Sequence, residues 1–162
     1  MVPDDLYRTD ILGWSKAQAE RLRRLQRGER VNDLDWEHVI EEIEDLGKSE
    51  LRTVTSNLRN AFLHALKVIG WPDHDAGDHW TQEITTFLGN ARDRFEPGMQ
   101  QHVDPVAIYQ LALQDLRGAP PIGGAAPRSL PERVEFTAAE LRDRCFGATD
   151  LLARLRAALP PA

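Results

Sequence analysis

Four side chains in one acidic segment are the first candidates for chemistry: His38, Glu41, Glu42 and Asp45. Glu41 and Glu42 lie three and four residues after His38, and Asp45 lies three residues after Glu42, spacings that place side chains on the same face of an α-helix. Imidazole and carboxylate groups on one helix face could bind a divalent metal ion, as Glu-x-x-His pairs do in di-iron helical bundles. Here the order is His-x-x-Glu, and the chain contains no second pair of this kind.

A solvated acidic helix face explains the same residues without a metal. Residues 33–50 carry eight acids and one Lys, a charge of −7, whereas residues 16–30 carry a charge of +4. Two antiparallel helices joined by a short turn at residues 28–32 would bring these opposite charges together. We therefore expect ion pairs between the two helices, each of them individually weak.

Two further histidines are candidate metal ligands. His64 shares a polar strip with Asn57 and Asn60 on an otherwise apolar helix, where a hydrogen-bonded structural histidine is the simpler interpretation. His79 closes an Asp- and His-rich loop over residues 73–79 whose spacing matches no established ligand signature. Asp and Gly are ordinary loop residues, so a polar loop that leads into a helix is the simpler interpretation of this segment.

Composition excludes several classes of protein. The 162 residues have a net charge of −6, and the single cysteine, Cys145, cannot form an internal disulfide and is expected to be buried. No apolar run approaches the roughly 18 residues of a membrane span. The acidic start lacks a signal peptide, so we expect a cytoplasmic protein. A net negative chain is a poor partner for nucleic acid.

Apolar residues recur every three or four positions along most of the chain, which predicts an all-α fold. We expect a single domain over residues 1–162, an antiparallel helical bundle of about five main helices with short C-terminal helices. A Gly- and Pro-rich stretch, residues 118–131, is expected to be an ordered surface wrap or a mobile loop. Whether Gly47 breaks or merely bends the acidic helix is undecided, since one Gly costs only about 1 kcal/mol. The main helices are expected over residues 10–27, 34–47, 49–70, 79–95 and 104–117.

The same periodicity predicts which side chains form the core. The expected core consists of Ile11, Trp14, Leu22, Val39, Ile43, Leu58, Phe62, Leu66, Trp80, Ile84, Phe87, Tyr109 and Leu113.

Several of these segments together resemble a bacterial family known only as domain of unknown function 29. The opening Tyr7-x-x-Asp10 with Trp14, the acidic string from Ile40 to Glu50, and His64 ahead of Pro72 carry the resemblance. The resemblance implies an all-helical fold and a bacterial cytoplasmic setting, and it implies no activity. It strengthens the case for a site among the residues of the shared pattern, namely Glu41, Glu42, Glu44, Asp45 and His64.

The sequence contains no phosphate-binding loop and no hydrolase or metalloprotease signature. The absence of a catalytic motif, together with strong amphipathic patterning, predicts a non-enzymatic module that binds a protein partner or self-associates. The alternative is a metal-binding helical bundle with a carboxylate and histidine site. Its candidate ligands are His38, Glu41, Glu42, Asp45, His64 and His79.

Overall fold

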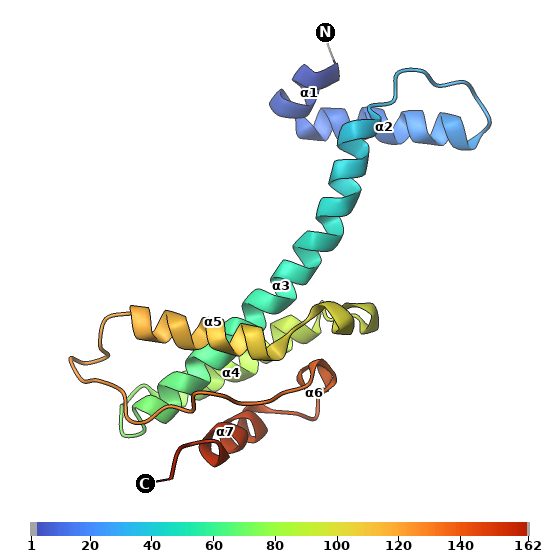
Figure 1. Ribbon diagram of the computed structural model, residues 1–162. Coiled ribbons are helices and arrows are strands. Elements are labelled where there is room, and N and C mark those ends of the chain that lie inside the picture. Colours follow the sequence, from blue (N-terminus) through green and yellow to red (C-terminus); the bar gives the residue numbers. More distant parts are fainter. Residues whose placement is uncertain (1–2, 162) are drawn as a thin grey trace. The chain divides into compact units, whose positions relative to one another are not determined.

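Helices make up most of the chain (Figure 1). The structure, a computed structural model, describes residues 3–161, with the backbone alone for residues 3–5. Within that range it contains no β-strand beyond an isolated bridge between Ile122 and Ala125, which confirms the all-α class. The elements are α1 (Pro3–Thr9), α2 (Ile11–Gln26), α3 (Trp36–Gly70), α4 (Gly77–Arg92), the 3-10 helix η1 (Pro97–His102), α5 (Pro105–Gly118), α6 (Ala138–Arg142) and α7 (Ala148–Ala157).

The chain forms two compact units, Met1–Lys48 and Ser49–Ala162. We call them the N-terminal unit and the C-terminal unit. α3 supplies residues to both units.

Local signals set the boundaries of α2 in the N-terminal unit. Asp10 caps the helix, as the sequence allowed, because its Oδ1 accepts a hydrogen bond from the backbone N of Gly13 at 2.8 Å. The helix ends before Gly28, whose φ of 81° lies in the left-handed region that glycine tolerates best. The buried apolar side chains of this unit are Trp14, Leu34 and Val39.

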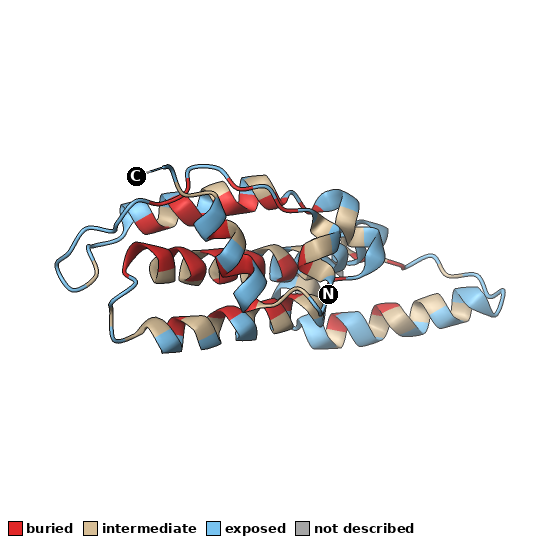
Figure 2. Ribbon diagram, turned by 90° about the horizontal axis from the view of Figure 1, so that it is seen from below, coloured by how far each residue is buried: buried red, intermediate tan, exposed pale blue. Residues whose placement is uncertain are grey.

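Aromatic side chains from three segments meet in the core of the C-terminal unit. The Phe62 ring on α3 lies edge-on to Tyr109 on α5, with centroids 5.6 Å apart, and 5.1 Å from the ring of Phe136. Figure 2 shows buried residues on the inner faces of the helices in this unit. At the surface, Nε and Nη2 of Arg59 each donate to a carboxylate oxygen of Asp115 at 2.5 Å, which joins α3 to α5.

Hydrogen bonds hold the Gly- and Pro-rich loop against the rest of the C-terminal unit. The indole of Trp71 donates to the carbonyl of Ala125 at 3.0 Å, and the backbone N of Arg128 donates to the carbonyl of Gly70 at 2.8 Å. The buried hydroxyl of Tyr109 donates to the carbonyl of Pro131 at 2.5 Å. These contacts match the first of the two sequence alternatives, an ordered wrap.

The helix ends follow the sequence signals with three exceptions. Asp104 caps α5 and Thr137 opens α6 with a capping box, both of which are residue types typical of helix starts. The sequence did not indicate α1 or η1, and it divided α3 at Gly47, where the structure has one uninterrupted helix. No helix within the described residues is long and apolar enough to cross a membrane.

Nine of the thirteen predicted core residues are buried, and two predictions are wrong. Ile11 and Ile43 are exposed, because each lies on a helix face that nothing in the described chain covers. Leu22 and Phe87 are half-buried. Cys145 is also exposed, contrary to expectation, in the turn that follows α6.

Candidate functional site

The structure does not gather the six candidate ligands into one site. His38, Glu41, Glu42 and Asp45 lie in the N-terminal part of α3, whereas His64 and His79 belong to the C-terminal unit. Among the residues described, no group of three or more His, Cys, Asp or Glu side chains could hold a metal ion. The metal-binding alternative therefore stays a prediction without a ligand cluster to support it.

Asp35, which immediately precedes α3, is the centre of a hydrogen-bond network in the N-terminal unit. Its Oδ2 accepts hydrogen bonds from the indole of Trp14 at 2.9 Å and from Nδ1 of His38 at 2.8 Å. Burial raises the pKa of this carboxyl, but the hydrogen bonds from Trp14 and His38 outweigh it, so the pKa lies below its ordinary value. A carboxylate only accepts, so the proton sits on Nδ1 of His38.

The side chain of Gln18 completes the junction between α2 and α3. It is buried, and its Oε1 accepts a hydrogen bond from the backbone N of Asp35 at 3.0 Å. Without Gln18, the backbone N–H of Asp35 would lack a hydrogen-bond acceptor, because the first N–H groups at a helix start have no acceptor within the helix. The network therefore fixes α2 on the start of α3, which is a structural role.

Tyr7 joins α1 to the same place. Its ring stacks on His38 with centroids 4.0 Å apart, and its hydroxyl donates to Glu42 at 2.6 Å. The hydrogen bond to Glu42 is the main cause that raises the pKa of Tyr7 to about 12. His38 and Glu42, two of the candidate ligands, are thus brought together by Tyr7 and serve the packing of α1.

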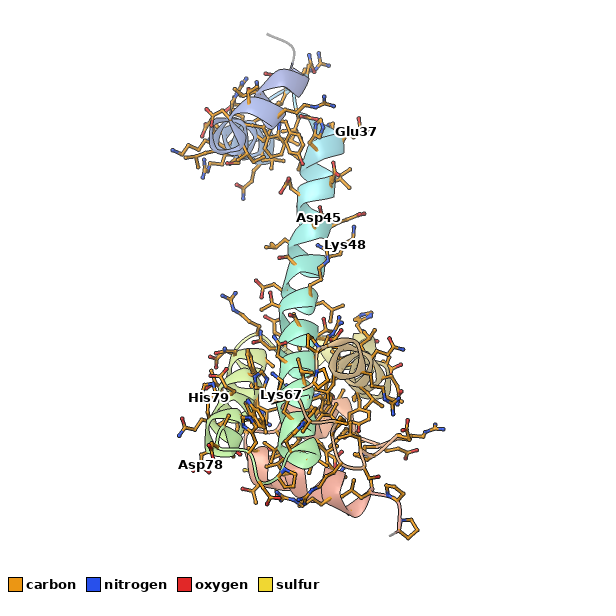
Figure 3. The ribbon with its side chains drawn as sticks, turned by 90° about the vertical axis from the view of Figure 1, so that its left-hand side faces the viewer. Glu37, Asp45, Lys48, Lys67, Asp78 and His79 are labelled. Carbon is orange, nitrogen blue, oxygen red and sulfur yellow. The ribbon has the colours of Figure 1, made fainter. Side chains whose placement is uncertain are left out.

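Apart from Glu50, which is half-buried and pairs with Arg94 at 3.0 Å, the remaining acids of α3 face solvent. Asp45 lies 3.3 Å from the amine of Lys48, one turn along the helix (Figure 3), and the same amine lies 3.4 Å from Glu44. Glu41 is exposed. These contacts are surface ion pairs of the kind that contribute little to stability.

The basic residues of α2 do not pair with these acids. Arg21 pairs with Asp33 at 2.8 Å, and Arg24 and Arg27 each lie 3.0 Å from Glu29. The expectation that the two helices neutralise each other is therefore wrong within the part of the chain described. The arginines reach the connecting segment instead, because it lies closer to the last turns of α2.

The two histidines of the C-terminal unit have separate surroundings. Nδ1 of His64 contacts the carbonyl of Asn60 at 2.9 Å, and burial lowers the pKa of this imidazole. His64 is therefore a hydrogen-bonded structural histidine. His79 is exposed in the first turn of α4, where Figure 3 labels it next to Asp78.

A row of exposed apolar side chains is the most unusual surface of the N-terminal unit. Trp36, Ile40, Ile43 and Leu46 follow one another at spacings of four, three and three residues on α3. Their exposed fractions are 54%, 51%, 66% and 67%, respectively. We call these four residues the α3 stripe. Contiguous exposed apolar surface of this kind marks a binding site more often than a solvent face.

The fold and this surface define the class: an all-helical protein with an exposed apolar helix face and, in the residues described, no group of His, Cys, Asp and Glu side chains that could hold a metal ion. The chain belongs to the family described as domain of unknown function DUF29, whose model matches residues 6–147. Among solved structures, an α-helical protein of unknown function from Rhodospirillum rubrum is 30% identical in sequence. That match covers 92% of this chain and 96% of the other, with a TM-score of 0.64. No curated protein matches the chain.

Neither the Asp35 network nor the α3 stripe was predicted as a site. The sequence placed Trp14 in the expected core and linked Tyr7 to the family resemblance. No sequence pattern indicated that Gln18 and Asp35 would join α2 to α3. The helical periodicity places the stripe residues on one face and predicts that this face packs in the core, which is wrong for all four of them. That pattern does not say whether another part of the chain covers the face.

Proposed function

We propose that this protein is a non-enzymatic module that self-associates through the α3 stripe, with α2 of a second copy as the occupant. The observation that carries the proposal is the exposure of all four stripe side chains on one helix. Apolar side chains that are exposed to water are unfavourable. Burying them in an interface stabilises the complex by about 25 cal/mol for each Å² of apolar surface removed from water.

The charged residues beside the α3 stripe indicate which kind of surface would cover it. Glu37, Glu41 and Glu44 follow one another at spacings of four and three residues, so they form an acidic row along one edge of the stripe. Two stripes packed against each other would bring two such rows together, and like charges across an interface are unfavourable. The occupant that the charges favour is therefore an apolar helix with a basic edge.

The exposed face of α2 has this chemistry. Leu12 is 62% exposed and lies on the same face of α2 as Lys16, Arg23 and Arg27, which are also exposed. Arg23 pairs with Glu20 at 3.4 Å and Arg27 with Glu29 at 3.0 Å, whereas Lys16 is a cation at the surface on the same helix face as Leu12. Leu12 would pack against the apolar side chains of the α3 stripe, and the basic residues of α2 would lie opposite its acidic row.

Two copies related by a twofold axis would make this contact twice. Each α2 would cover the α3 stripe of the other copy, as in the symmetric interfaces that are common in homodimers. A stable interface buries about 800 Å² on each partner, so both halves of the contact are needed.

Light scattering after size exclusion, over a range of protein concentrations, tests the proposal. We expect a dimer for the native chain and a monomer for Ile40→Asp and Ile43→Asp. Leu111→Asp is the matched control, because Leu111 is an exposed leucine at 43% on α5, away from the stripe in sequence and in the C-terminal unit. Circular dichroism of each variant confirms that it remains folded.

A charge exchange tests the identity of the occupant. Lys16→Glu with Arg23→Glu should weaken the dimer at least tenfold, and adding Glu41→Lys with Glu44→Lys should restore it. Added salt should also weaken the native dimer, because it screens exposed charges. A native chain that stays monomeric, a dimer that survives Ile43→Asp, or a dimer that tightens with salt would overturn the proposal.

A further inference from the structure

A cavity in the C-terminal unit has an unusual density of guanidinium groups. It lies where the end of α4, η1 and α6 meet, and its volume is about 570 Å³. Arg92, Arg142 and Arg144 line it together with Gln100 and one acid, Asp143. Cavities of this size hold small molecules, and side chains that converge on them determine which chemistry they bind.

Backbone carbonyls hold two of these arginines in place. Arg92, which is half-buried, donates from Nε to the carbonyl of Leu141 at 2.9 Å and from Nη2 to the carbonyl of Phe146. Arg142 donates from Nε to the carbonyl of Phe95 at 3.2 Å. The side chains are therefore oriented before any ligand arrives, which reduces the entropy lost on binding.

These two arginines keep unused charge and unused donors. Among the residues described, neither guanidinium has a carboxylate within 4.0 Å, and no hydrogen bond uses Nη1 of Arg92 or either terminal nitrogen of Arg142. Arg144 differs, because Asp93 pairs with it at 3.0 Å. The one acid in the wall, Asp143, directs its Oδ1 to the backbone N of Cys145 at 2.9 Å.

We propose that this cavity binds the phosphate group of a small phosphorylated molecule, with Arg142 and Arg92 as the main ligands of the phosphate. Guanidinium groups bind phosphate through pairs of parallel hydrogen bonds, and such charged hydrogen bonds are roughly twice as strong as neutral ones. Gln100 and the exposed Arg144 at the rim would contact the rest of the molecule. This site is independent of the α3 stripe.

Purely structural arginines are the competing explanation, because the backbone contacts alone tie α4 to the segment around α6. The structural explanation accounts for the Nε donors of Arg92 and Arg142. It gives no role to the two terminal nitrogens of Arg142. The two explanations differ in whether the native chain binds a phosphorylated molecule.

Isothermal titration calorimetry at constant ionic strength tests the proposal. The probes are inorganic phosphate, pyrophosphate and glucose 6-phosphate, with glucose as the uncharged control. We expect saturable binding of at least one phosphate-containing probe and none of glucose. Tighter binding of glucose 6-phosphate than of inorganic phosphate identifies a phosphorylated metabolite as the ligand. Tighter binding of pyrophosphate or inorganic phosphate identifies the phosphate group itself.

Substitutions at Arg142 assign the binding to this cavity. Arg142→Gln should weaken binding by about tenfold or more, and Arg142→Lys should recover part of it because the charge is kept. Arg156→Gln on α7 is the control, since it removes an exposed arginine outside the cavity and should leave binding unchanged. Circular dichroism verifies the fold of each variant. No binding by any of the three phosphate probes, or equal loss in the Arg142→Gln and Arg156→Gln variants, would overturn the proposal.

Discussion

Single carboxylates organise this protein at the residue scale. Asp35 accepts hydrogen bonds from Trp14 and His38 where α2 meets α3, and Glu140 accepts them from Arg154 and from the backbone of Thr137 in the C-terminal unit. In both positions the acid joins a helix start to a side chain from another element. Removing one of these carboxylates leaves its hydrogen-bond donors without an acceptor. The resulting loss of stability is larger than the net contribution of the hydrogen bond itself.

Glu140 allows a test of this role by pH. Its hydrogen bonds, foremost those from Arg154, lower its pKa from 4.5 to about 2. Its contribution is therefore complete above pH 4.5 and is lost as the pH falls toward 2. We expect Glu140→Gln to lower the free energy of unfolding by about 1 kcal/mol at pH 7, because glutamine can still accept the hydrogen bond from the backbone of Thr137 but loses the charge that pairs with Arg154.

Urea denaturation at several pH values measures this difference. The curves of the native chain and the variant should converge between about pH 4 and pH 2. Glu96→Gln, which removes an exposed carboxylate that caps nothing, should have no effect at any pH. An equal deficit for Glu140→Gln at pH 7 and pH 2 would contradict the assignment.

Only part of the candidate site could be predicted at this scale. The periodicity correctly placed His38 and Glu42 on one helix, since side chains four residues apart are neighbours. It could not predict that Tyr7 lies between them, because Tyr7 comes from a separate helix 35 positions away from Glu42. Contacts between distant segments depend on how the elements pack, and a one-dimensional pattern does not contain that information.

Among the elements, α3 differs most from its sequence prediction. Gly47 was expected to end or bend the helix, yet α3 runs unbroken from Trp36 to Gly70. The local penalty of one glycine is about 1 kcal/mol, which the hydrogen bonds of the flanking turns outweigh. The helix ends only at Gly70, ahead of Trp71 and Pro72, because proline cannot continue a helix.

Replacing Gly47 tests the continuity of α3. A Cβ at this position meets no atom within 4 Å, so Gly47→Ala should stabilise the protein by about 0.5–1 kcal/mol. Gly28→Ala is the contrasting control. Its φ of 81° is left-handed, so alanine there should destabilise the protein by about 1–2 kcal/mol. Chemical denaturation measures both, and a destabilising Gly47→Ala would mean that α3 is interrupted in solution.

At the scale of the whole molecule, the two units differ in how much apolar surface they bury. The large core cluster lies entirely in the C-terminal unit, from Val54 to Leu155, whereas the apolar side chains buried in the N-terminal unit, among those described, are Trp14, Leu34 and Val39. The all-α class and the family were both predictable from sequence, because helical periodicity and the acidic string extend through most of the chain. A single domain over residues 1–162 stays a prediction.

Hydrogen exchange should show this difference directly. We expect the amides of α2 to exchange faster than those of α5 and of the second half of α3, because local opening costs less where few apolar contacts are lost. The measurement is best made by mass spectrometry on the Ile43→Asp variant, so that self-association does not protect α2. Equal protection in both units would contradict two unequal cores.

The positions of the tryptophans give the protein an optical signal of its own. Trp14, Trp71 and Trp80 are buried, and Trp36 in the α3 stripe is the one that faces water. Indole emission shifts to shorter wavelength when water leaves its surroundings, so covering the stripe would change the fluorescence of Trp36 and leave that of the other three nearly constant. The unlabelled chain therefore reports whether its stripe is covered, and dilution of the native protein in a fluorimeter would follow the assembly in real time.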